Sequence, residues 1–208
     1  MKNPLIITIG REYGSGGREI GELLAQRLGI AFYDKKIISL AAEKSGLSKE
    51  FIESNEQRER GGLFARMANS AAYTGGYFAA PYAPMVSESI FVSQSHVIRE
   101  IAERESAVIV GRCADYVLAG RSNTINVFIH APMQMRVNRI MALYHLSEAD
   151  ALKAIATSDK ERGNHYFRYT DQKWGKAQNY DVCINAALMG VEKTAEMLAD
   201  LAGIEERI

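Results

Sequence analysis

The hydrophobic positions of the chain fall into short continuous runs that are separated by longer amphipathic segments. A run such as 107–110 (AVIV) is typical of a central parallel strand that is covered on both faces. The runs and the residues that flank them predict strands over residues 5–9, 30–33, 107–110, 124–129 and 182–184.

The segments between these strands repeat apolar residues at helical spacing. In the first of them, Ile20, Leu24 and Leu28 share one face, and Gly29 ends the pattern. The same spacing predicts helices over residues 18–28, 35–44, 49–60, 87–104, 133–144, 147–160 and 190–202. Residues 61–85, rich in Gly, Ala and Tyr, indicate an irregular segment. Strands that alternate with helices indicate an α/β fold with a parallel sheet.

The composition is that of one globular domain. The chain has 208 residues, and 25 Lys and Arg balance 25 Asp and Glu, so no overall field favours nucleic acid or an anionic membrane. No apolar run approaches the roughly 20 residues of a membrane helix, and the N-terminus lacks a signal-peptide pattern. Cys113 and Cys183 both lie in apolar, strand-like contexts. We therefore expect two buried thiols, no disulfide and a cytoplasmic protein.

A glycine-rich run, GREYGSGGRE at residues 10–19, connects the first predicted strand to the first helix. Glycines let a backbone approach an anion closely, and a helix N-terminus offers free amides and partial positive charge. We see no packing role for the glycines on either side of Ser15, so we predict a phosphate-binding loop; the alternative is a tight structural turn. The run departs from the usual G-x-x-x-x-G-K-[ST] pattern, because Gly17, Arg18 and Glu19 supply neither the lysine nor the hydroxyl.

Five stretches of the chain together point to a known family. They are GREYGSGGREIG (10–21), FYDK (32–35), VGRCADY (110–116), DKER (159–162) and YDVCIN (180–185). In this order they make the chain resemble the cytidylate kinase-like family of P-loop nucleoside monophosphate (NMP) kinases. The resemblance implies a P-loop NTPase-like three-layer sandwich with a five-stranded parallel sheet, in a single kinase domain over residues 1–208. It also implies a helical NMP-binding insertion over residues 35–105 and a lid region over residues 136–170.

By this resemblance the loop binds the β-phosphate of ATP through its backbone amides, at Gly14, Ser15, Gly16, Gly17 and Arg18. Because the loop lysine is missing, we expect Arg18 or Arg11 to supply its charge; an arginine stays ionised and can hold phosphate with two donors. Glu19 stands where a hydroxyl would hold Mg²⁺, so it is a candidate metal ligand. The alternative for Glu19 is a solvated first-turn residue that favours the helix dipole.

Three further residues are expected to bind the phosphate acceptor. Asp34 follows a strand and corresponds to an acidic residue that, in the resembling kinases, meets the acceptor nucleoside; it could instead cap the next helix. Arg112 lies just past strand 107–110, where parallel sheets bind ligands, and suits an acceptor phosphate. Val110 stands where the resembling cytidylate kinases have an acidic residue. Asp115 is expected to compensate from the next turn, unless it caps a helix.

Arginines in the lid region are expected to carry the chemistry. Arg139 and Arg162, together with Arg18, would stabilise the charge that develops on the transferred phosphoryl group. Arg136 and Arg168 are weaker candidates for the same role. Arg136 and Arg139 share a helix face because they are one turn apart. The alternative is a solvated basic face with surface ion pairs.

The function indicated by these residues is ATP-dependent phosphoryl transfer to an NMP, most of all CMP or dCMP. ATP and Mg²⁺ are the expected cofactors and small-molecule nucleotides the partners, with no nucleic acid and no membrane. The missing lysine leaves a second hypothesis, a catalytically weak nucleotide- or phosphate-binding regulatory module of the same fold. Residues 61–85 offer few base-reading groups, which leaves a third, a kinase for another small acceptor. The same aromatic segment is also a candidate homodimer surface.

Overall fold

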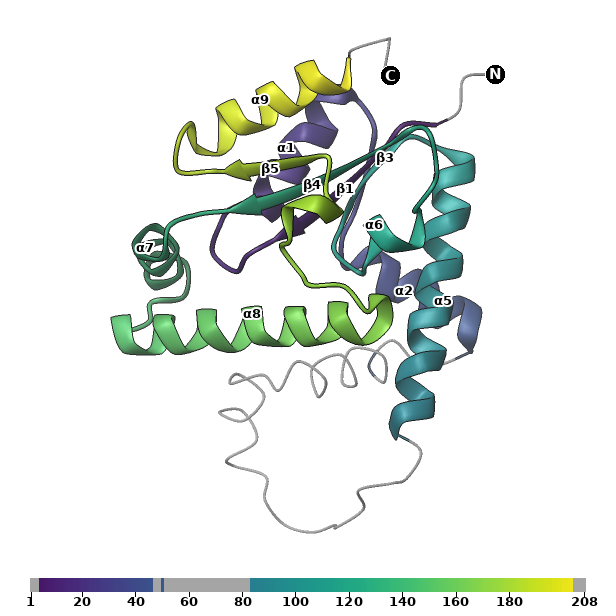
Figure 1. The fold of residues 1–208 in the computed structure, drawn as a ribbon, viewed down its shortest axis with the longest axis horizontal. Helices are drawn as coiled ribbons and strands as arrows, with labels where there is room; N and C mark the ends of the chain where they lie inside the picture. Colours follow the sequence, from purple (N-terminus) through teal and green to yellow (C-terminus); the bar gives the residue numbers. More distant parts are fainter. Residues whose placement is uncertain (1–3, 47–49, 51–82, 204–208) are drawn as a thin grey trace.

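The structure, a computed structural model, describes residues 4–46, 50 and 83–203 (Figure 1). Its centre is a five-stranded sheet in the order β2-β3-β1-β4-β5, in which every neighbouring pair is parallel. The strands are β1 (Ile6–Arg11), β2 (Ala31–Tyr33), β3 (Ala107–Val110), β4 (Thr124–His130) and β5 (Val182–Asn185). Because the strands are parallel, their carboxyl ends meet at one edge of the sheet, where ligands bind in open α/β folds.

One face of the sheet is covered by α1 (Gly17–Leu28) and α9 (Gly190–Ala202). Ile7 and Ile9 of β1 pack there against apolar residues of the two helices, such as Leu24. Gly21 allows the close approach of α1 to the sheet, because a Cβ at this position would lie 2.9 Å from Cδ1 of Ile9. The amphipathic pattern of residues 18–28 therefore forms a helix that is held directly against the central strand.

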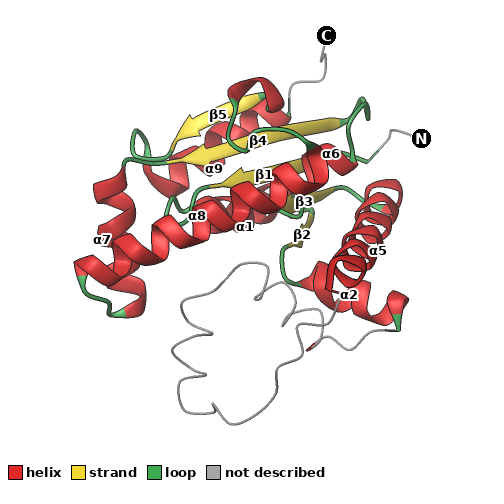
Figure 2. Cartoon of the chain, turned by 60° about the horizontal axis from the view of Figure 1, so that its bottom comes forward, coloured by secondary structure: helices red, strands yellow, loops and turns green. Residues whose placement is uncertain are grey.

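The opposite face is covered by α2 (Lys36–Ser45), α5 (Ala83–Arg104) and α6 (Ala114–Val117), which pack on β1, β2 and β3. Helices α7 (Met133–Tyr144) and α8 (Glu148–Thr170) follow β4, and α8 crosses the molecule from α7 to α5 (Figures 1 and 2). At the far end of α8, Tyr169 stacks on Phe91 of α5 with ring centroids 4.1 Å apart. A short 3₁₀ helix, η1 (Ala177–Asn179), leads into β5.

The predicted α/β fold with five parallel strands is confirmed, and each predicted strand is present within two residues of its expected bounds. Two helix boundaries are wrong. The helix expected over 147–160 continues to Thr170, because Tyr166 is buried and its hydroxyl donates to Asp115 at 2.6 Å. Helix α5 begins at Ala83, inside the segment expected to be irregular. Apart from Glu50 and residues 83–85, the expected helix over 49–60 and the segment 61–85, with its candidate dimer surface, lie outside the described residues.

The two cysteines differ from expectation. Cys113 is buried, but it follows β3 in a left-handed turn with φ 52° rather than lying in a strand. Cys183 does lie in a strand, yet it is exposed, because β5 is an edge strand that pairs only with β4. In the described part of the chain no helix is both long and apolar enough to cross a bilayer.

Candidate active site

The glycine-rich loop joins the end of β1 to the start of α1, at the carboxyl edge of the sheet. Gly14 and Gly16 have left-handed backbones, with φ 82° and 86°. A Cβ on Gly14 would lie 3.0 Å from the carbonyl oxygen of Arg136, and one on Gly16 would lie 3.2 Å from Val191. Our expectation that these glycines have no packing role is therefore wrong, since both the conformation and the available space favour glycine.

The loop closes on itself through Ser15 and leaves several amides without partners. The buried Ser15 hydroxyl donates to the Glu12 carbonyl at 2.9 Å, and the Ser15 N–H donates to the same oxygen at 3.3 Å. Among the described residues, no hydrogen bond occupies the backbone N–H groups of Gly14, Gly16, Arg18 and Glu19. Open amides at the start of a 12-residue helix suit the oxygens of a phosphate group, and the helix dipole adds to the attraction.

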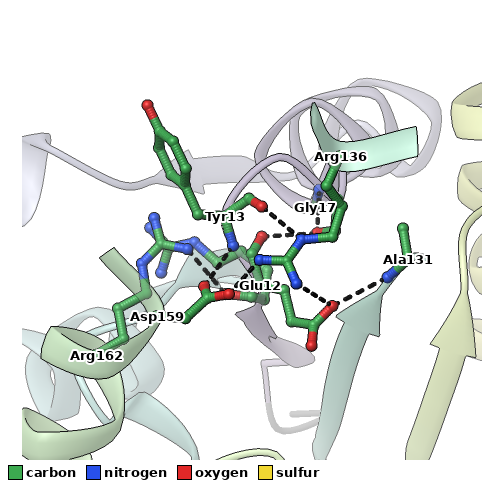
Figure 3. Close-up of polar contacts among 9 residues, drawn as sticks. Glu12, Tyr13, Gly17, Ala131, Arg136, Asp159 and Arg162 are labelled. Carbon is green, nitrogen blue, oxygen red and sulfur yellow. Dashed lines mark hydrogen bonds and ion pairs between the residues drawn. The ribbon is translucent and has the colours of Figure 1, made fainter. Parts of the chain in front are cut away.

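A buried arginine fixes the loop from the side (Figure 3). Arg136 of α7 has 4% of its side chain exposed, and its Nε donates to the Tyr13 carbonyl at 2.8 Å. Its guanidinium also pairs with Glu12, at 3.2 Å, and with Asp159 of α8. Asp159 in turn accepts the Tyr13 N–H at 2.8 Å, and Glu12 accepts the N–H of Ala131 at 3.1 Å. Helices α7 and α8 and the end of β4 therefore hold both polar groups of the Tyr13 backbone and the Glu12 carboxylate.

Arg139 lies at the loop, one helical turn after Arg136. Its guanidinium pairs with Glu19 of α1, and its Cζ would lie 3.7 Å from a Cβ built on Gly16. The Glu19 side chain is 52% exposed and that of Arg139 is 27% exposed. A pair this open to water contributes little to stability, so either group can leave it for a ligand at small cost.

Arg162 reaches the loop from α8. Its Nη1 donates to the carbonyl oxygen of Arg11 at 3.0 Å, and its Cζ lies 5.4 Å from the centroid of the Tyr13 ring. The carbonyl contact and the ring contact hold this guanidinium next to the first residues of the loop (Figure 3).

Arg18 and Asp34 form a separate pair beside the loop. The Arg18 Nε lies 3.1 Å from Asp34 Oδ2, and its Nη1 lies 3.1 Å from Glu22. The Arg18 guanidinium lies near the Phe32 ring, 5.8 Å from the centroid, so its side chain extends toward the end of β2. Asp34 is almost buried, and Arg11 lies 3.9 Å from its other oxygen.

The turn after β3 presents Arg112 and Asp115 to a small pocket. Arg112 is itself left-handed, with φ 61°, and is 9% exposed. The pocket encloses about 50 Å³, and its polar lining includes Arg11, Arg112, Asp115, Arg162, Tyr166 and Tyr180. Burial raises the pKa of Asp115 and outweighs the opposing effect of the hydrogen bond from Tyr166. The same burial raises the pKa of the Cys113 thiol, which disfavours the nucleophilic thiolate.

The structure brings the expected site residues to one edge of the sheet, in three groups. Glu19, Arg139 and Arg162 lie around the loop, whereas Asp34 and Arg18 lie together at the end of β2. Arg112 and Asp115 line the pocket, which Arg11 and Arg162 also reach.

Sequence reasoning missed two features of the loop: Glu12 and Asp159 both pair with Arg136, and Asp159 accepts a hydrogen bond from the Tyr13 N–H. The available signal was the spacing of Asp159 and Arg162, three residues apart and therefore on one helix face. No pattern along the sequence joins Tyr13 to a residue 146 positions away.

Within the described ranges, no group of three or more His, Cys, Asp or Glu side chains is arranged to hold a metal. Mg²⁺ at phosphate-transfer sites usually takes one or two carboxylates and completes its shell with water and substrate phosphates. Glu19, in the first turn of α1 and open to solvent, fits that partial role.

The sheet order and the loop between β1 and α1 give the chain the fold of the P-loop kinases. Shikimate kinase from Bacteroides thetaiotaomicron shares this fold with a TM-score of 0.54, at 15% identity over 95% of this chain and 97% of that one. An uncharacterized protein from Eubacterium ventriosum superposes with a TM-score of 0.70, at 26% identity over 97% of this chain and 99% of that one.

Residues 6–187 match the cytidylate kinase-like family, and the chain belongs to this family. It is 22% identical to the cytidylate kinase of Ignicoccus hospitalis, over 93% of this chain and 96% of that protein. It is 25% identical to the cytidylate kinase of Methanosarcina mazei, over 92% and 93% of the two chains. A 99-residue stretch is 29% identical to uronate isomerase from Corynebacterium glutamicum, but it spans 48% of this chain and only 19% of that enzyme.

Proposed function

We propose that the chain is a kinase that transfers the γ-phosphoryl group of ATP to an NMP, with CMP or dCMP as the first candidate acceptor. The observation that carries the proposal is the loop itself: the N–H groups of Gly14, Gly16, Arg18 and Glu19 have no partner among the described residues, and arginines from α7 and α8 lie beside them. Membership of the cytidylate kinase-like family and full-length similarity to two proteins named cytidylate kinase support the choice of acceptor.

On the donor side, the loop amides would bind the phosphates of ATP. The left-handed glycines keep the backbone clear of side chains, and the dipole of α1 adds partial positive charge at the same point. Arg139 would leave its exposed pair with Glu19 and bind phosphate oxygens. Glu19, released in this way, would become a ligand of Mg²⁺, and the ion would supply positive charge that offsets the charge of the phosphates.

On the acceptor side, Asp34, Arg112 and Asp115 would bind the NMP. Arg112 is nearly buried and lines the pocket, so its guanidinium is suited to a bidentate contact with the acceptor phosphate. The Asp34 carboxylate would accept hydrogen bonds from the sugar or base. Residues 35–105 would form the NMP-binding insertion, which begins directly after Asp34.

Catalysis would depend on charge and position rather than on a covalent intermediate. Arg162 is held beside the loop and also lines the pocket with Arg112, so it suits the space between donor and acceptor. With Arg139 it would stabilise negative charge on the moving phosphoryl group, whereas the Arg18 guanidinium lies in its own pair with Asp34. Residues 136–170 would act as the lid that excludes water from this space.

The test is ADP production from ATP and Mg²⁺ with each common NMP, with shikimate and with no acceptor. We expect the highest kcat/KM with CMP or dCMP, and a loss of at least about 100-fold in kcat for Arg162→Met, in line with the large effect of arginines on phosphoryl transfer. Turnover with another acceptor only would move the assignment to a kinase for that molecule. No acceptor-dependent ADP with any of them would refute kinase activity.

A second candidate function is a nucleotide-binding regulatory module with little turnover. Gly17 at the position of the loop lysine and the ion pair between Arg139 and Glu19 favour it, since both leave the loop without the usual cation. Thermal unfolding with ATP and Mg²⁺, and separately with CMP, separates the two functions. Stabilisation by ligands together with turnover supports the kinase, and stabilisation without turnover supports the module.

A further inference from the structure

Gly17 stands where the usual phosphate loop has its lysine, and the space beside it is already filled. A Cβ built on Gly17 would lie 2.6 Å from Cβ and 3.1 Å from Cγ of Arg11, and 3.2 Å from Cβ of Ile129. Contacts of 2.6 Å between carbon atoms do not occur in folded proteins. The stem of Arg11 therefore occupies the position from which a side chain at residue 17 would start.

The Arg11 side chain continues from Gly17 to the neighbouring strand ends. Its Nη1 would lie 2.1 Å from a Cβ on Gly111, so the guanidinium rests against the backbone just after β3. Its Nη2 lies 3.9 Å from Asp34 Oδ1, at the end of β2, and the residue lines the pocket that Arg112 and Arg162 also reach. The absence of side chains at Gly17 and Gly111 thus leaves room for the Arg11 side chain to lie along the carboxyl edge of the sheet.

Arg18, the other candidate for the loop cation, is arranged differently. Its side chain is 58% exposed, against 18% for Arg11, and its guanidinium contacts both Asp34 and Glu22. The charge of an exposed arginine is screened by water. The less exposed guanidinium of Arg11 at the strand ends acts on a phosphate more strongly, because less water screens it.

We propose that Arg11, and not Arg18, supplies the fixed positive charge of the phosphate loop. Residue 11 would then carry the charge that the usual loop carries on a lysine at the position of residue 17. The proposal rests on the proposed function, since it assigns the residue that contacts the ATP phosphates. A lysine at residue 17 and the present position of the Arg11 side chain exclude each other on steric grounds. A lysine at 17 requires the space that the Arg11 stem fills, and Arg11 requires the absence of a side chain at 17.

The experiment measures direct binding of ATP, and of adenosine as the phosphate-free probe, by calorimetry without acceptor. The variants are Arg11→Lys and Arg11→Met, which share an unbranched stem that can pack on Gly17 and differ in charge. Arg27→Met, in the last turn of α1 and exposed, is the control for the loss of one positive charge at a position away from the loop. Thermal unfolding without ligand checks that each variant is folded.

We expect Arg11→Met to raise the Kd for ATP at least about tenfold, the lower end of the effect of losing a hydrogen bond to a charged group, with adenosine binding unchanged. Arg11→Lys should bind ATP more tightly than Arg11→Met, and Arg27→Met should match the wild type. If the wild type binds ATP and Arg11→Met binds it equally well, the inference falls while the proposed function stands. An equal loss for ATP and adenosine would assign Arg11 a structural role and also overturn it. If the wild type binds no ATP, both fall.

Discussion

Removal of the buried Arg136 guanidinium is the perturbation whose size can be worked out most directly from the structure. In Arg136→Met, the Glu12 and Asp159 carboxylates and the Tyr13 carbonyl lose their shared partner. Breaking a buried ion pair by removing one partner costs about 3–5 kcal/mol. Because the two carboxylate side chains remain 27% and 20% exposed and keep some water, we expect a somewhat smaller loss, about 2–4 kcal/mol.

The assay is thermal unfolding without ligand. For a chain of this size each kcal/mol shifts Tm by about 2–4 °C, so Arg136→Met should unfold roughly 5–15 °C below the wild type. Arg139→Met is the matched control, because Arg139 lies one turn along the same helix and its pair with Glu19 is more exposed. That control should lose about 1 kcal/mol at most.

A second substitution tests the cause of the loss. In Arg136→Met the Asp159 carboxylate is left without its cation, so adding Asp159→Asn should restore part of the lost Tm. Equal Tm losses for Arg136→Met and Arg139→Met would refute the reasoning, because they would show that burial of the Arg136 guanidinium adds nothing to its contribution to stability. Additive losses for the double variant would refute the proposed coupling to Asp159.

Three further predictions follow from the site. Gly14→Ala should cost more stability than Gly29→Ala in chemical denaturation, because both positions have positive φ but only Gly14 would bring a Cβ to 3.0 Å from a backbone oxygen; equal losses would contradict this. Burial raises the pKa of Asp115, so its stabilising contribution is complete below the unfolded value of about 3.9 and is lost as the pH rises through the folded value. Asp115→Asn should therefore gain in Tm relative to the wild type between pH 4 and pH 7, and a difference that does not vary with pH would count against it. In native protein a maleimide should label the exposed Cys183 and spare the buried Cys113, as mass spectrometry can check; comparable labelling rates would show that Cys113 is accessible.

Much of the fold could be predicted because its signals are local. A run such as residues 107–110 shows its burial in its own composition, and the helix after residue 17 shows its buried face in its spacing. The end of α8 could not be predicted in this way, since residues 161–170 include a glycine and many polar side chains. That stretch remains helical because of distant contacts, such as Tyr166 with Asp115 and Tyr169 with Phe91.

The site was predicted less completely than the fold. Residue types indicated which side chains can bind phosphate, but not which of them contact one another. Arg136 was expected on the same face as Arg139, yet it is buried in ion pairs whereas Arg139 is not. The choice between Arg11 and Arg18 depends on where a Cβ on Gly17 would fall relative to the Arg11 side chain and on how far each arginine is exposed, which are properties of the packed structure.

The hydrogen bonds that hold the Tyr13 backbone affect how the molecule can respond to a ligand. Its N–H and its carbonyl are bonded to α8 and α7, the same helices that carry Arg162 and Arg139. The loop backbone is therefore hydrogen-bonded to the helices that carry these arginines, and much of the entropy cost of ordering the loop is met when the chain folds. A ligand would then meet a largely preorganised cradle and lose little affinity to backbone ordering. Mutations inside α8 could alter nucleotide affinity without touching a nucleotide.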